Sequence, residues 1–326
     1  MTTYIVRRLL LFVPLAAGMV VVAFSLLLLV PGDPAAVLLG QEASPDAIAA
    51  LRARLNLDDP WYLRLGRYFL GLFHGDMGQS IFQSAPVAEI IAGRLGATIE
   101  LAVAALIFAT LLGVTLGVLA ATWRGSLVDV AAMLLAQLGV SMPIYWLGIL
   151  LMLAFAVELN WLPAIGRGEP LILALGQAIT GDFRPLLGSL QHIALPAISL
   201  GIQSAAIISR LVRASMLEVL HNDFIRTAFA KGLRRPRVII VHAFRNALLP
   251  VLSVIGLRFG MLLGGAVLTE SIFGWPGLGQ LTITAISQRD IPLVQGIVLT
   301  FALMFALVNL VVDLLYAWVD PRVRLA

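Results

Sequence analysis

Residues 226–250 read RTAFAKGLRRPRVIIVHAFRNALLP, and this stretch decides how the rest of the chain is organised. It is the most basic part of the sequence, and long apolar segments flank it on both sides. Its basic residues are Arg226, Lys231, Arg234, Arg235, Arg237 and Arg245. Because basic loops between membrane spans stay on the cytoplasmic side, the sequence predicts a cytoplasmic loop here.

Composition places the chain in a membrane. Hydrophobic residues make up 60% of the 326 residues and charged residues only 12%, whereas soluble domains carry about 25% charged residues. The net charge of +4 follows the loops, which indicates membrane topology rather than nucleic-acid binding. Cysteine is absent and the four histidines lack metal-binding spacing, so the sequence predicts neither a metal site nor thiol chemistry.

Hydropathy predicts an all-α polytopic protein with six membrane spans. The first span, residues 9–30, follows two arginines and shows no cleavage site, so we expect a retained helix rather than a cleaved signal. The even number of spans and the positions of Lys and Arg predict that both termini are cytoplasmic. The five further spans are expected near residues 98–122, 130–157, 191–216, 248–270 and 292–318.

Residues 31–97 predict a small extracytoplasmic helical insertion after the first span. Ser44 before Pro45 has the form of a helix start, and Pro60 opens a second short helix. The expected division of the chain is residues 1–97, the first span with this insertion, and residues 98–326, a five-helix core with its cytoplasmic loop at 217–249.

Within the basic loop, residues 224–231 predict a short helix that Gly232 ends. Phe224, Thr227 and Ala228 share one face of that helix and Phe229 lies beside it, which gives a small apolar patch with a basic rim. A groove on a partner protein can accept such a helix. By the residues alone, a solvated loop that only fixes topology is an equally good interpretation.

Ordered sequence blocks extend the argument beyond the loop. They are Arg226-Thr227-Ala228 with Ala230-Lys231-Gly232, His242 to Ala247 with Pro250, Pro31-Gly32-Asp33-Pro34, Gly75-Asp76-Met77-Gly78, Pro143 with Trp146-Leu147-Gly148, Glu270 to Gly279, and Asn309 with Asp313, Tyr316 and Asp320-Pro321-Arg322. Together they resemble the EAA loop and other motifs of the dipeptide/oligopeptide/nickel permease family of binding-protein-dependent ABC importers, in its first-permease type. Arg226 departs from the general pattern, which has Glu there.

The resemblance implies the type I ABC importer fold and a permease subunit without catalytic residues. ATP and Mg would bind two cytoplasmic ATPase subunits, since this chain has no P-loop. Other expected partners are a second homologous permease in a heterodimer, an extracytoplasmic substrate-binding protein and the lipid of the inner membrane, but no nucleic acid. A coupling helix seated in an ATPase would contain Phe224, Arg226, Thr227, Ala228, Phe229, Ala230, Lys231 and Gly232.

The fifth span and the turn after it supply candidates for a pore or gate. Gly256, Gly260 and Gly264 predict close helix packing, either within the chain or along the pore against the second permease. Arg258 either pairs with Asp313 or faces an aqueous pore, because a charge inside the membrane is costly. The turn after the span is either a gate, a surface for the delivering protein or a structured loop, with Glu270, Trp275, Pro276 and Gly277 as its candidate residues.

The sequence leaves the substrate open among dipeptides, longer peptides, glutathione and chelated nickel. A secondary transporter driven by an ion gradient is the main rival, but it would favour inverted repeats and acids at the membrane midplane. The acids of this chain lie towards the ends of the predicted spans. A membrane enzyme is disfavoured because no paired nucleophile and base is recognisable.

Overall fold

The computed structural model describes residues 2–29, 44–54 and 58–319, and these are helical apart from turns, loops and one isolated bridge between Gln79 and Pro86. The helices are α1 (Thr2–Leu29), α3 (Pro45–Arg54), α4 (Trp61–Phe73), α5 (Val87–Thr122), α6 (Leu127–Ser141), α7 (Ile144–Leu151), π-helical η1 (Met152–Glu158), α8 (Leu171–Ile179), α9 (Arg184–Leu220), α10 (Asp223–Ala230), α11 (Arg235–Arg237), π-helical η2 (Val238–Phe244), α12 (Arg245–Ile272), α13 (Leu278–Ser287) and α14 (Ile291–Val319).

Length and composition confirm a polytopic helical architecture. Within the described ranges, three helices can each cross a membrane (Val87–Thr122, Arg184–Leu220 and Ile291–Val312), and two bent helix pairs raise the number to five. The 28-residue α1 adds an apolar stretch, Leu10–Ser25. The expected six spans are reached when each bent pair counts as one span and α1 is included.

Two predicted spans are corrected at proline. The expected span at 130–157 is two helices, α6 and α7 with η1, which meet at an angle of 107° beside Pro143. The fifth span, expected near residues 248–270, lies within α12, which begins at Arg245, and the helical path bends by 57° between Leu248 and Pro250. Proline lacks an amide proton and its ring crowds the preceding turn, so it bends or breaks a helix.

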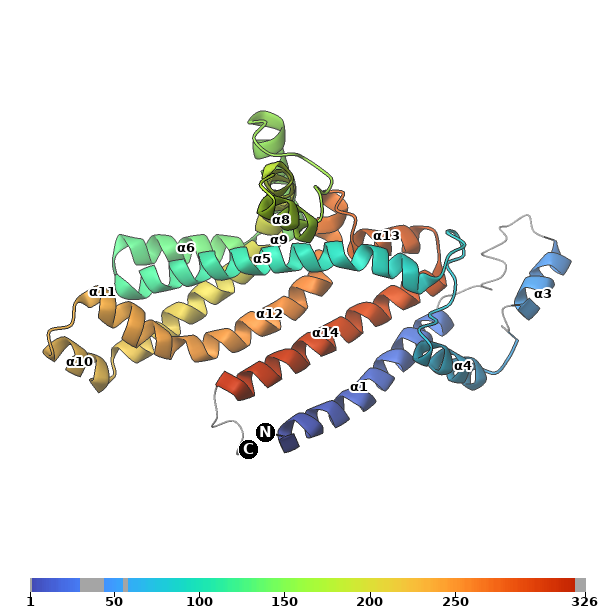
Figure 1. Ribbon diagram of the computed structural model, residues 1–326, viewed down its shortest axis with the longest axis horizontal. Helices are drawn as coiled ribbons and strands as arrows, with labels where there is room; N and C mark the ends of the chain where they lie inside the picture. The colour runs from blue at the N-terminus through green and yellow to red at the C-terminus, as the bar shows by residue number, and fades with distance from the viewer. Residues whose placement is uncertain (1, 30–43, 55–57, 320–326) are drawn as a thin grey trace.

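Most of the long helices run between the two ends of one long axis, and the segment around α8 projects sideways from its middle (Figure 1). Figure 1 shows α10 and α11 at one end and α3 with α4 at the other, while α5, α12 and α14 run between these ends. Ser44 begins α3 as predicted, because its hydroxyl accepts the Ala47 amide at 3.3 Å. The proposed division at residues 97 and 98 falls inside α5, which starts ten residues earlier, at Val87.

A buried acid connects the segment before α5 to the start of α14. The Ser80 hydroxyl donates to Asp290 at 2.5 Å, and the Leu293 amide donates to the other carboxylate oxygen at 3.3 Å. Asp290 therefore caps α14, where an anion is favoured, while it holds a segment 210 residues away in sequence.

Glycines set the close approach of α5 and α9 at the centre of the bundle. A Cβ atom added at Gly113 would lie 2.6 Å from the Ala205 carbonyl oxygen, and one at Gly117 would lie 2.6 Å from the Ser209 carbonyl oxygen. These distances leave no room for a side chain without moving a helix backbone. Both glycines therefore serve the close packing of the two helices.

We expect Gly117→Ala to lower stability by about 1–3 kcal/mol, because overpacking forces helices apart. Gly93→Ala on the same helix is the matched control, since a Cβ there meets nothing within 4 Å. The measurement is the thermal midpoint of the detergent-solubilised chain. Equal midpoints for the two variants would contradict the assigned packing.

Candidate functional site

The short helix of the basic loop, α10, turns one side to the core and the other outward. Ile225 is 2% exposed and Ala228 is also buried, in a cluster that includes Met216 of α9 and Val238 of η2. Ala228 was predicted to belong to the exposed apolar patch, and this is wrong. Residues 225 and 228 are three apart, so they share one side of the helix, and that side faces the core. The outward-exposed residues of this segment are Phe224, Arg226, Thr227, Phe229, Ala230 and Lys231.

The C-terminal end of α10 follows the prediction, and its N-terminal end lacks a side-chain cap. Asn222 stands at the N-cap position, but its side chain makes no capping hydrogen bond. At the other end Gly232 has φ +76°, which glycine adopts without strain. The Lys231 amide donates to the Thr227 carbonyl at 3.0 Å, and the Leu233 amide donates to the Ala228 carbonyl at 3.3 Å. The chain therefore leaves the helix in a fixed direction.

The segment after α10 anchors it to the bundle. Arg235 of α11 donates from Nη2 to the Thr122 carbonyl, the last residue of α5, at 2.9 Å. The π-helical η2 follows, and its Val238, Ile239 and Ala243 are buried in the same cluster as Ile225. Short π-helical segments are often found at functional sites. The buried side of α10 thus packs on a continuous apolar base that includes residues of α5, α9, η2 and α12.

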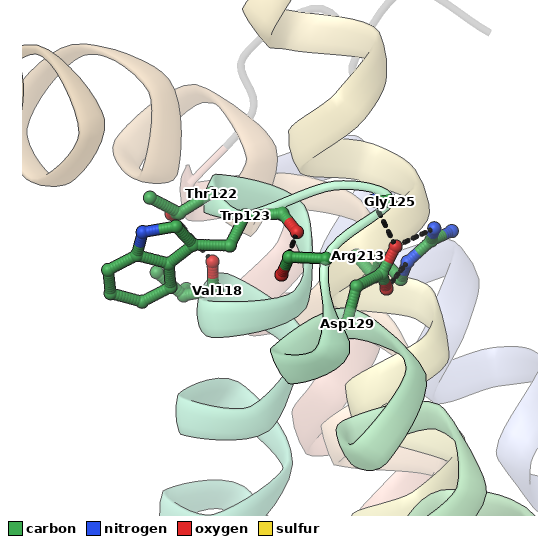
Figure 2. A network of polar contacts seen from close by, with 7 residues as sticks. Val118, Thr122, Trp123, Gly125, Asp129 and Arg213 are labelled. Carbon is green, nitrogen blue, oxygen red and sulfur yellow. Dashed lines mark hydrogen bonds and ion pairs between the residues drawn. The ribbon is translucent and has the colours of Figure 1, made fainter.

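An ion pair joins α6 to α9 near the same end of the molecule. Arg213 Nε donates to Asp129 Oδ1 at 2.7 Å and its Nη2 donates to Oδ2 at 2.8 Å, while the Gly125 amide donates to Oδ2 at 3.0 Å. Figure 2 shows the guanidinium facing the carboxylate beside the turn that links α5 to α6. This bidentate pair, here called the Asp129–Arg213 clamp, fixes the α5–α6 turn to the helix that leads into α10.

Sequence reasoning missed the clamp. Arg213 lies within the predicted fourth span, residues 191–216, and the helix itself continues beyond that span to Leu220. Asp129 was not singled out. The signal that could have found the pair is an acid in the first turn of one apolar helix and an arginine in the last part of another, at the same predicted side of the membrane.

A second polar network lies under the turn between α12 and α13. Glu270 is fully buried; its carboxylate accepts from the Thr98 hydroxyl at 2.8 Å and from the amides of Gly279 and Gln280 at 2.7 and 3.1 Å. Glu270 thereby caps the N-terminus of α13, where a negative charge is favoured. A Cβ at Gly277 would lie 2.4 Å from this carboxylate, which explains the glycine.

The neighbouring Trp275 completes this network. Its indole Nε1 donates to the Ala97 carbonyl at 2.8 Å, and the Arg167 guanidinium lies 5.7 Å from its ring centre. Arg167 also forms an ion pair with Glu100. Glu270, Trp275 and Gly277 are buried and Pro276 is half-buried, so these side chains serve the packing of the turn itself. The geometry is that of a structured turn held by internal hydrogen bonds, although Glu100 Oε1 and Arg167 Nε are buried without a partner.

We expect Glu270→Ala to destabilise the chain by about 3 kcal/mol or more. The change leaves buried donors of Thr98, Gly279 and Gln280 without their acceptor, and each unsatisfied group costs about 1–3 kcal/mol. Glu270→Gln keeps one acceptor oxygen and should lose less. The comparison is made by thermal midpoint in detergent, and equal losses for the two variants would contradict the capping role.

The glycine series of α12 divides between two roles. A Cβ at Gly256 would lie 2.4 Å from Val312, and one at Gly260 would lie 2.9 Å from Phe305, both residues of α14. A Cβ at Gly264 meets nothing within 4 Å. Gly256 and Gly260 therefore serve packing within the chain, and only Gly264 stays open to another partner or to a pore.

Arg258 lies near the middle of α12 and is half-buried. Its Nη1 is 3.6 Å from Met261 Sδ, and its Nε is buried without a hydrogen-bond partner. The Asp313 side chain, its predicted partner, lies outside the described residues. Among the side chains that the structure describes, no acid forms an ion pair with Arg258.

The arrangement of helices matches a solved importer. The membrane chain of the MetNI methionine ABC transporter, in an inward-facing conformation, aligns with a TM-score of 0.55 over 71% of this chain and 96% of that chain, at 16% identity. The fold is thus that of a type I ABC importer permease, with several helices crossing the membrane.

Sequence comparison gives the family. The model described as "Binding-protein-dependent transport system inner membrane component" matches residues 113–325, and its N-terminal companion matches residues 1–102. The dipeptide transport system permease proteins DppB of Alkalihalophilus pseudofirmus and Escherichia coli are each 47% identical over 99% of this chain and over 100% and 99% of their own lengths. The glutathione transport system permease protein GsiC of Salmonella paratyphi A is 40% identical over 99% of both chains.

The chain therefore belongs to the binding-protein-dependent transport system inner membrane component family. It is a multi-pass helical permease of the inner membrane, and the family to which it belongs works with a substrate-binding protein. The family resemblance and the permease fold predicted from the sequence are both confirmed.

Proposed function

We propose that this chain forms one half of the pore of an ATP-driven importer for di- or oligopeptides with a free carboxylate. Support comes from dipeptide permeases at 47% identity and a glutathione permease at 40%, each aligned over almost the whole chain. The cargo of all these relatives is a short peptide by name. The second half of the pore is a homologous permease, and a binding protein delivers the peptide from outside.

We further propose that α10 couples the pore to two separate ATPases that carry ATP and Mg. The observation that supports this is its division into a buried and an exposed side. Ile225 and Ala228 are buried against the bundle. Phe224 is 44% exposed, and Thr227 and Lys231 are exposed with it. A helix whose inner side packs on the bundle passes a push on its outer side to the membrane helices.

This assignment sets the orientation of the chain. The basic loop with α10 faces the cytoplasm, where the ATPases are, and both termini lie on the same side. The insertion at residues 44–86 then faces outward, since α3 and α4 occupy the end of the molecule opposite α10. The rule that positive loops stay inside agrees with this placement.

Site-directed cross-linking in the complete importer tests the coupling role. The chain has no native cysteine, so Thr227→Cys provides a single thiol on the outer side of α10. We expect a cross-link from this thiol to an ATPase subunit. Phe73→Cys on α4, which is 84% exposed at the opposite end, is the control and should give none. A product from neither thiol, or uptake that persists without the ATPases, would contradict the proposal.

A further inference from the structure

One face of α12 is exposed, and the coupling role of α10 does not explain it. Leu257, Met261, Gly264 and Leu268 recur at helical spacing, and all four are exposed. The glycines that pack against α14, Gly256 and Gly260, lie on another side of the same helix. No part of the chain that the structure describes covers the face of Leu257 to Leu268.

Arg258 sits at the edge of this face at mid-helix. Its Nη1 reaches the Met261 thioether at 3.6 Å, which is a weak acceptor, and its Nε has no partner. A cation in the middle of a bilayer costs about 2.5–3.5 kcal/mol, so intramembrane arginines face a bundle interior or a water-filled cavity. The guanidinium is therefore expected to face the bundle interior or water rather than lipid.

From this geometry we propose that Arg258 lines the aqueous path and binds the carboxylate of the passing peptide. A guanidinium matches a carboxylate with two parallel hydrogen bonds, and its fork is not occupied by a described acid. The thioether contact is weak, so a carboxylate displaces it readily. The apolar residues on either side, Leu257 and Met261, make no competing polar bond, which lets the peptide leave again. This proposal depends on the peptide-importer function proposed above.

The rates at which thiol reagents modify a cysteine beside Arg258 in the assembled importer report whether water reaches this position and what the local charge is. Met261→Cys is treated with methanethiosulfonate reagents, one anionic and one cationic. The unmodified chain has no cysteine, so a gain in the mass of the variant reports modification of this one thiol. We expect the anionic reagent to react faster, and Arg258→Gln to change each rate by about threefold in opposite directions, as a charge near 7 Å does in water. A saturating dipeptide should slow the anionic reagent.

Leu268→Cys is the matched control on the same exposed face. It lies ten residues, about 15 Å, along the helix from Arg258, which exceeds the screening length of about 8 Å in physiological salt. Its rates should not respond to Arg258→Gln. If Met261→Cys is inert while Leu268→Cys reacts, the Arg258 position is dry and the proposal fails. If the reaction rates of Met261→Cys are the same with and without Arg258→Gln, an acid of the partner permease already neutralises the charge of Arg258. The proposal then also fails.

Measurements of dipeptide uptake distinguish a failure of this proposal from a failure of the proposed function. In proteoliposomes with the complete importer, Arg258→Gln should lower the maximal dipeptide uptake at least tenfold, and Arg258→Lys should retain more of it. Undiminished uptake by Arg258→Gln, or no protection by dipeptide, overturns carboxylate binding while leaving the importer function intact. Absence of dipeptide uptake by the unmodified importer contradicts the proposed function itself, whatever the thiol rates show.

Discussion

Phe224→Asp should reduce ATP-driven uptake at least tenfold while leaving the thermal midpoint of the isolated chain unchanged. Phe224 is 44% exposed on the outer side of α10, so the fold does not need it. Buried in a partner groove, an aromatic anchor contributes about 2 kcal/mol or more to binding, and a factor of ten in affinity corresponds to 1.4 kcal/mol. Uptake and ATP hydrolysis by the reconstituted importer measure the effect.

The adjacent residue supplies the contrast. Ile225 is buried in the core, so Ile225→Asp should lower both the uptake and the thermal midpoint, because it buries a charge in an apolar cluster. Phe224→Leu keeps an apolar side chain and should restore much of the uptake. Normal uptake by Phe224→Asp would show that α10 does not dock through this side.

Breaking the Asp129–Arg213 clamp is expected to have the second large effect. Asp129 is 5% exposed and the Arg213 side chain is 28% exposed, so the pair is only partly buried, and loss of a hydrogen bond to a charged group costs about 1.5–3 kcal/mol. Asp129→Ala and Arg213→Ala should each lower the thermal midpoint of the chain strongly. Arg213→Lys should also lose stability, because an ammonium cannot reproduce the two parallel bonds.

The double variant tests whether the two residues act as a pair. If they do, Asp129→Ala with Arg213→Ala loses less stability than the two single losses added together. Because α9 runs directly into α10, the double variant should also transport peptide less efficiently per ATP hydrolysed, even at temperatures where it stays folded. Additive losses and unchanged coupling would contradict the role of the clamp.

The local elements of the loop could be predicted from the sequence to within a residue or so, but their contacts could not. The helix expected at residues 224–231 spans Asp223 to Ala230, since its start and the glycine stop are local signals. Ala228 was assigned to the wrong side because the pattern around it is apolar on several sides. Only packing against η2 and α9 shows that Ile225 and Ala228 point inward.

The sequence by itself determined the membrane as solvent, the all-helical class, the positions of most spans and the family, because these depend on hydropathy and on ordered local motifs. The tertiary structure decided the break at Pro143, the Asp129–Arg213 clamp, the burial of Glu270 and Trp275, and the different roles of Gly256, Gly260 and Gly264. The physical reason is the distance along the sequence over which each interaction acts. A helix propensity or a turn acts over a few residues, whereas an ion pair across 84 positions, or the space above a glycine, exists only once two helices have met.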